Sequence, residues 1–212
     1  MRKKVNKTIT VKSNEVFDGK GCLYTWRGAG YPSKCHASKE ISEKEPPMFI
    51  LSPGATLKNL QIECALDGIH TTKNNKIQNI INRDVEEDAI TIGENILIED
   101  SEFWFCQDKC LQMNRANKVT IRNNKFYHSS FPILANTGKS VSVSGNYFYN
   151  VNRAIRSNGS LSNISVRDND VQWGDCYLAA SNKAKIDDYG GGSVEGIKNK
   201  YCTESGGKIT QK

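Results

Sequence analysis

The sequence contains no apolar run of the roughly 18 residues that a membrane-spanning helix needs, so we expect no membrane partner. Its 29 Lys and Arg residues are dispersed rather than clustered, and no known nucleic-acid-binding motif is present. We therefore expect no nucleic acid partner, although the net charge is +6. Acidic polysaccharides are the other large class of anions that a basic protein attracts.

None of the seven cysteines belongs to a CxxC pair, which argues against a structural zinc site. Cysteines scattered through loop-like segments are typical of two or three disulfides in an extracellular protein, here with one thiol left over. We predict two disulfides from the positions of the loops, and a third pairing is an option that its short spacing makes geometrically demanding. These pairs are, in that order, Cys22–Cys35, Cys176–Cys202 and Cys106–Cys110.

The first four residues, Met1 to Lys4, resemble the charged start of a signal peptide, yet no apolar segment follows them. Two alternatives remain open: a leader has been removed and a methionine supplied, or the protein leaves the cell by another route. Both predict a secreted protein, which we expect to be a monomer.

Helical periodicity is also missing, and this excludes a doubly wound α/β fold. From Pro53 onward one short phrase recurs instead: an apolar residue, a polar residue and then usually Asn or Asp. A leucine-rich repeat has a similar period, but its leucine signature is absent. The copies begin 20 to 23 residues apart, at Leu57, Ile77, Ile98, Ile121, Val143 and Val166.

This period, combined with short β segments, predicts an all-β fold: a single-domain, right-handed parallel β-helix of about seven to eight coils. We expect an N-terminal strand and covering loop over residues 1–52, repeating coils over 53–188 and a Gly-rich tail over 189–212. Apolar residues would stack inward in columns. Asn at the bends would satisfy buried backbone groups or adopt the left-handed conformation.

Acidic residues recur with the same period in the phrases ALDGIHT, EEDAITI and DKCLQMN, where Asp67, Asp88 and Asp108 stand 20 to 21 residues apart. On successive coils these residues, with Glu87 and Lys109, would form one ladder. Carboxylates on strands about 4.8 Å apart repel each other unless positive charge lies among them. A hard cation held by oxygen ligands is the usual solution.

Several phrases resemble the pectate lyases of polysaccharide lyase family 3, and the resemblance covers most of residues 8–114. It implies a secreted β-helix that cleaves polygalacturonate by β-elimination and needs calcium. The phrases are VFDGKG, GATLKNLQI, DGIH, DVEEDAITI and DKCLQMN.

By this resemblance, Asp67, Glu87 and Asp88 match the family's calcium ligands. Lys109 matches the lysine of its DK motif, which is a catalytic or substrate-binding residue. His70 is expected to make a structural hydrogen bond within its own turn.

The family continues with a KxxRSxG phrase, which corresponds here to Arg153, Arg156 and the residues up to Gly159, but one coil too late. The coil directly after Lys109 carries Phe131 to Leu134 instead. Either an extra coil, roughly residues 116–137, was inserted, or the site has decayed and the two arginines match by chance.

The leading hypothesis is a calcium-dependent pectate lyase that releases unsaturated oligogalacturonides, with Lys109, Arg153 and Arg156 as catalytic residues. Arg115 and Lys125 are candidates for binding uronate groups. The alternative is a non-catalytic pectate-binding protein on the same fold, and a weaker one is a structural or adhesive β-helix without a saccharide ligand.

Overall fold

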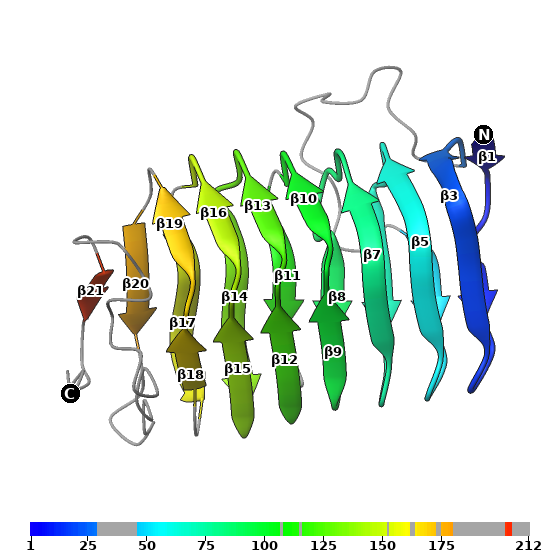
Figure 1. Ribbon diagram of the computed structural model, residues 1–212. Helices are drawn as coiled ribbons and strands as arrows, with labels where there is room; N and C mark the ends of the chain where they lie inside the picture. The colour runs from blue at the N-terminus through cyan, green and yellow to red at the C-terminus, as the bar shows by residue number, and fades with distance from the viewer. Residues whose placement is uncertain are drawn as a thin grey trace.

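A computed structural model describes residues 1–28, 46–106, 108–114, 116–151, 153–161, 164–172, 175–179 and 202–204. Every regular element in this part of the chain is a β-strand (Figure 1). It follows that none of these residues belongs to a helix long and apolar enough to cross a membrane.

One sheet contains nine parallel strands, and successive strands in it come from successive turns of the chain. Its order is β2 (Ile9–Val11), β4 (Pro47–Leu51), β6 (Asp67–Thr71), β8 (Ile90–Ile92), β11 (Lys109–Met113), β14 (Phe131–Gly138), β17 (Arg153–Leu161), β20 (Asp175–Ala179) and β21 (Cys202–Glu204).

The other sheet contains twelve strands and divides into two faces at β7 (Lys76–Asn82). The first half of β7 pairs with β9 (Ile96–Glu99), and its second half pairs with β10 (Glu102–Trp104). The remaining strands are β1 (Arg2–Val5), β3 (Val16–Trp26), β5 (Thr56–Glu63), β12 (Lys118–Arg122), β13 (Lys125–Tyr127), β15 (Ser140–Ser144), β16 (Tyr147–Tyr149), β18 (Ile164–Arg167) and β19 (Asp170–Gln172).

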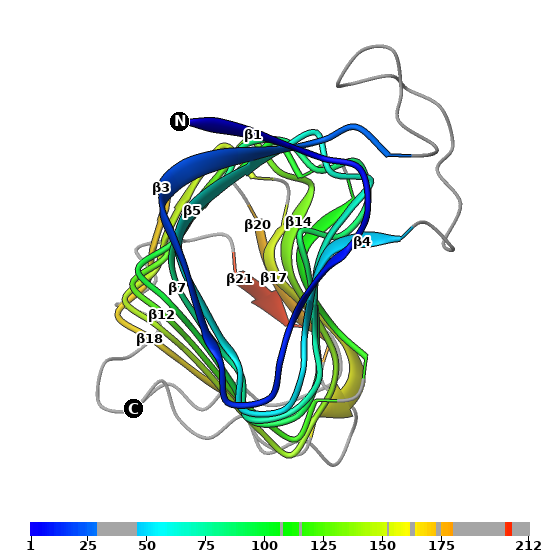
Figure 2. The same ribbon diagram turned by 90° about the vertical axis from the view of Figure 1, so that its right-hand side faces the viewer.

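All of these pairings are parallel, and the view along the axis shows successive turns lying over one another (Figure 2). The predicted parallel β-helix is thereby confirmed. Because each turn repeats the path of the last, residues one period apart in the sequence become neighbours on adjacent strands.

The recurring phrase marks a bend between two faces. Its third residue has a positive φ of 52° to 63° in every copy, which confirms the left-handed conformation expected there. Asn, Asp and Gly tolerate this backbone best, because other side chains crowd the neighbouring carbonyl oxygen. The six residues are Asn59, Asn79, Asp100, Asn123, Gly145 and Asp168.

The interior is filled by columns of like side chains. Phe126 stacks between Phe103 and Phe148, with ring centroids 5.0 and 4.9 Å apart. One residue further along the same bends, the buried amides of Asn124 and Asn146 bond to the backbone of adjacent turns. Such columns stabilise the stack because each polar group on the bend is satisfied by the next turn.

The cysteines correct one disulfide prediction. Cys22 is a free thiol, so the predicted Cys22–Cys35 bond is wrong. Its side chain belongs to the buried core of β3, where the register places it opposite Leu60, whereas Cys35 lies outside the described residues. Packed there, the free thiol behaves as a small hydrophobic side chain. Cys64 is disulfide-bonded instead.

The structure confirms one of the other two disulfide pairings and leaves the second as a prediction. Cys106 and Cys110 form a disulfide with their Cα atoms 5.3 Å apart, so the short spacing is compatible with a bond. Strands β20 and β21 pair with Cys176 opposite Cys202, but these side chains lie outside the described part. The Cys176–Cys202 bond stays a prediction.

Candidate functional site

The acidic ladder lies where three neighbouring strands of the nine-stranded sheet begin. β6 starts at Asp67, Glu87 and Asp88 come just before β8, and Asp108 directly precedes Lys109 at the start of β11. The backbone joins these turns closely, since Gly68 N–H donates to the Asp88 carbonyl at 2.9 Å. A Cβ on Gly68 would lie 2.1 Å from the Ala89 carbonyl oxygen, so glycine is required for this approach.

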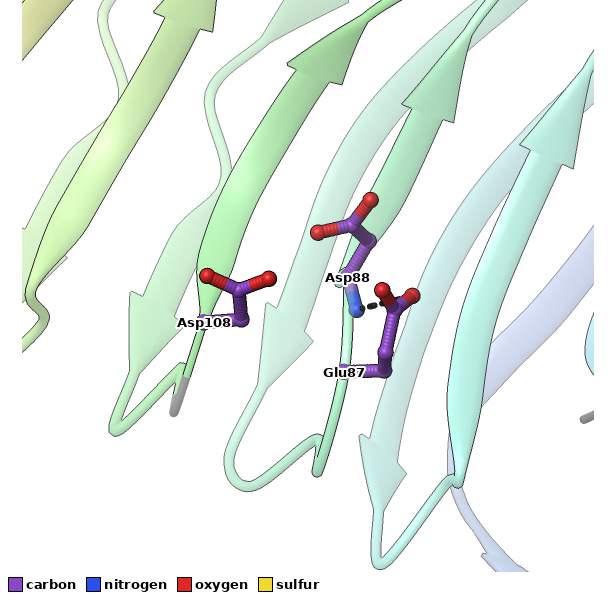
Figure 3. A group of neighbouring side chains, drawn as sticks. All are labelled: Glu87, Asp88 and Asp108. Atoms are coloured by element: carbon purple, nitrogen blue, oxygen red, sulfur yellow. Dashed lines mark hydrogen bonds between the residues drawn. The ribbon is translucent and has the colours of Figure 1, made fainter. Parts of the chain in front are cut away.

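Three carboxylates gather at this edge. One oxygen each from Glu87, Asp88 and Asp108 lie within 4.8 Å of one another (Figure 3). Asp88 is buried, and its backbone N–H donates to Glu87 Oε2 at 2.9 Å. Carboxylate oxygens grouped in this way are the ligands that calcium takes, so the residues present fit a hard divalent cation.

Asp67, the first of the predicted ligands, lies outside this group of three. Its Oδ2 is 2.5 Å from Nε2 of His70, three residues along the same strand. This contact is the structural hydrogen bond expected of His70, and it raises the pKa of the imidazole. The Asp67 Oδ1 atom is buried without a hydrogen bond among the described residues.

Lys109 contacts two of the three carboxylates. Its Nζ donates to Asp88 Oδ1 at 3.3 Å and also contacts Asp108. The lysine is buried. Burial opposes its charge, but the hydrogen bonds to Asp108 and Asp88 and their negative charges outweigh this and raise the pKa of Lys109. The ammonium is therefore held protonated.

The protonation equilibrium of Asp88 is strongly perturbed. Burial, followed by the charge of Glu87, raises the pKa of Asp88 to about 7, and the opposing effect of Lys109 is too small to restore it. A buried carboxylate beside two others is costly to ionise, and a bound cation would favour its ionised form. This cost is a second reason why a cation fits here.

Gln112 completes the group from the exposed side of β11. With its amide nitrogen turned toward Asp88, it donates to Asp88 Oδ2, and its oxygen accepts from Lys109 Nζ at 3.3 Å. Sequence reasoning assigned no role to this residue. Its spacing from Lys109 gave no signal, because residues three apart on a regular strand point to opposite faces.

The predicted basic residues are distributed unevenly. Arg156 lies on β17 with its guanidinium carbon 5.2 Å from the ring centroid of Phe131. β17 begins at Arg153, whose side chain is outside the described part, as is the whole of Arg115. Lys125 lies on β13 of the other sheet, where its Nζ is 3.3 Å from Glu102. The structure thus groups Lys109 with the carboxylates and does not group Lys125 with them.

Fold and site together define a parallel β-helix that carries a carboxylate and lysine centre at one edge of a sheet. A family profile described as Pectate lyase matches residues 1–211, and the chain belongs to this pectate lyase family. It is also similar to a protein named "Probable pectate lyase E" from Neosartorya fischeri, with 36% identity over 114 residues. That match covers 51% of this chain and 42% of the relative, so less than half of the relative's length is spanned.

Proposed function

We propose that this protein is a secreted, calcium-dependent pectate lyase that cleaves polygalacturonate by β-elimination to unsaturated oligogalacturonides. The observation that carries the proposal is the cluster of Glu87, Asp88 and Asp108 around Lys109, on the β-helix of a pectate lyase family member. The partly covered relative is itself named as a probable pectate lyase, which is consistent with this activity.

Glu87, Asp88 and Asp108 would hold the calcium, and the buried Oδ1 of Asp67 is a fourth candidate oxygen. Bound there, calcium would neutralise the carboxylates and the substrate's uronate, stabilising the negative charge that develops during elimination. The assignment thus adds Asp108 to the ligands expected from the sequence. It makes Asp67 the more distant member, because one of its oxygens is engaged by His70.

In the elimination, the bond from C5 to hydrogen breaks and the proton passes to a base. The electron pair forms the C4–C5 double bond, the bond from C4 to the glycosidic oxygen breaks, and that oxygen takes up a proton. Asp88 and Asp108 hold Lys109 protonated, so this lysine is not available as the base. We therefore assign Lys109 to contact with the substrate. Arg156 and Arg153 remain the candidates for proton abstraction and uronate binding, since an arginine holds a carboxylate bidentately.

The test is incubation with polygalacturonate, with calcium and with a chelator, while the ultraviolet absorbance of the unsaturated product is followed. We expect calcium-dependent product formation, loss of turnover in Lys109→Ala and a loss of about 10²-fold in Arg156→Ala. Arg153→Ala should mainly raise KM. Lys118→Ala, an exposed lysine on β12 of the other sheet, is the matched control and should resemble wild type.

Calorimetry separates the metal site from the chemistry. The triple variant Glu87→Ala, Asp88→Ala, Asp108→Ala should lose calcium binding, whereas Lys109→Ala should retain it within a few-fold. Undiminished binding in the triple variant would place the calcium elsewhere.

A non-catalytic pectate-binding protein is the second candidate, and one specific observation favours it. Phe131 and Leu134 occupy the strand next to Lys109 and Gln112, where the resemblance leads one to expect basic residues. In that case the protein would bind polygalacturonate with calcium and release no unsaturated product.

A further inference from the structure

The register of three adjacent strands relates the acidic cluster to the later arginine. β14 lies between β11 and β17, and Phe131 at its start is the neighbour of Lys109. Adjacent strands are about 4.8 Å apart, so the Phe131 ring stands one strand beyond the ammonium. Three residues further along β14, Leu134 is the neighbour of Arg156.

Arg156 does not extend straight out from its own place on β17. Its guanidinium carbon is 5.2 Å from the centroid of the Phe131 ring, although its partner in the register is Leu134. Since the strands are parallel, the side chain leans back toward the strand starts, on the side of β17 that faces β11. Glu87, Asp88 and Asp108 lie near the starts of β8 and β11 (Figure 3), and Lys109 is the first residue of β11.

The contact has the geometry of a cation–π interaction, in which a guanidinium lies within about 6 Å of a ring centroid. An aromatic ring beside Lys109 adds no charge of its own, but it provides a surface on which a cation from the next turn can rest. The Phe131 ring on β14 therefore takes the place of a basic residue by holding the guanidinium of Arg156, which comes from β17.

We propose that Phe131 is a positioning residue that holds the Arg156 guanidinium beside Lys109, where it meets a uronate bound at the carboxylate cluster. This inference rests on the proposed function. It resolves the difficulty that Arg156 comes one turn too late in the sequence, because the side chain covers the distance that the backbone does not. Phe131 and Arg156 then act as one unit, whereas in a decayed site they would act independently.

A double-mutant cycle distinguishes these possibilities, with Phe131→Leu, Arg156→Gln and the double variant assayed on polygalacturonate with calcium. A cation–π contact is worth about 0.5 to 2 kcal/mol, which corresponds to about 2- to 30-fold in kcat/KM. We expect Phe131→Leu to lose activity within that range, Phe131→Tyr to recover it, and the double variant to be no worse than Arg156→Gln. The matched control is Tyr149→Leu on β16 of the other sheet, which should keep wild-type activity. Additive losses, or a Phe131→Leu variant with wild-type kcat/KM, would overturn the inference.

A second measurement works without any turnover. The rate at which phenylglyoxal modifies Arg156, followed by peptide mass spectrometry in the absence of substrate, should rise in Phe131→Leu and stay at the wild-type value in Phe131→Tyr and Tyr149→Leu. An unchanged rate in Phe131→Leu refutes the contact, whether or not the protein is a lyase. If the wild type forms no unsaturated product but the rate rises as expected, the proposed activity fails while the Phe131–Arg156 unit stands. In that case, the phenylglyoxal reaction is repeated with trigalacturonate present. Protection of Arg156 from modification in wild type and loss of this protection in Phe131→Leu would support a role of Phe131 in positioning Arg156 for binding. Equal protection in the two proteins would overturn it.

Discussion

Replacing Asn146 by Ala removes the middle member of the buried asparagine column. Its Oδ1 accepts from the Asn124 backbone N–H at 2.9 Å, and its Nδ2 donates to the Ile121 carbonyl at 3.1 Å. The same amide bonds to the side chains of Asn124 and Asn169 at 3.1 and 2.9 Å. Asn146 is 1% exposed, so water does not replace these partners without opening the turn.

The size of the effect follows from the two backbone groups that lose their partners. A buried donor or acceptor left unsatisfied costs about 1 to 3 kcal/mol, so the Asn124 N–H and the Ile121 carbonyl together cost about 2 to 6 kcal/mol. This is a large part of the about 5 to 15 kcal/mol by which a domain is stable. The variant should therefore unfold at a clearly lower urea concentration.

Urea denaturation followed by far-ultraviolet circular dichroism measures this change in the free energy of unfolding. Asn123→Ala is the matched control, because Asn123 is exposed at the corresponding bend of the adjacent turn. Its φ is 56°, a conformation that costs an alanine about 1 to 2 kcal/mol, so the control variant measures the backbone cost alone. A loss in Asn146→Ala no larger than in Asn123→Ala would show that the buried column does not stabilise the stack through its backbone bonds.

Three further predictions concern stability and thiol chemistry. Burial opposes the charge of Glu99, but hydrogen bonds from Lys76 and Arg122 outweigh it and lower the pKa of this carboxyl. Its stabilising contribution is present above the unfolded value of 4.5 and lost as pH falls below it, so acid titration of unfolding should show a smaller loss in Glu99→Gln than in wild type. The double variant Cys106→Ala, Cys110→Ala should lower the free energy of unfolding by about 2 kcal/mol in urea denaturation, because the disulfide closes only a short loop. Iodoacetamide should label Cys22 only after unfolding, as judged by mass spectrometry, and rapid labelling of the folded protein would contradict its burial.

The functional consequence of the fold is that one edge of one sheet gathers residues from several turns. Glu87 and Asp88, Asp108 and Lys109, and finally Phe131 stand at the starts of β8, β11 and β14. Under the proposed function, a polymeric substrate lying across these strands would meet the carboxylates first and the aromatic and basic side chains on the following turns. The order of these groups along the axis is the order of the turns in the sequence.

The repeating architecture could be deduced from the sequence alone. A phrase that recurs every 20 to 23 residues must return to the same wall of a solenoid, and its third residue reports a bend because Asn, Asp and Gly share a tolerance for positive φ. The same period identified the acidic ladder and Lys109, since residues one period apart become neighbours on adjacent strands.

Which carboxylates lie together was decided by the tertiary structure. Period places backbone positions side by side, but the direction of a side chain at a bend depends on how the chain turns there. Asp108 therefore joins Glu87 and Asp88, while Asp67 pairs with His70 on its own strand. In the same way, the direction of its side chain on β3 places Cys22 in the buried core as a free thiol.

Arg156 shows the limit of counting turns. The sequence places Arg156 two turns beyond Lys109, a separation that suggests that the two side chains are too far apart to act on the same substrate. The structure shows its long side chain leaning back onto Phe131, the neighbour of Lys109. A flexible side chain spans more than the spacing between strands, so contacts across turns follow from packing and not from the position of the backbone alone.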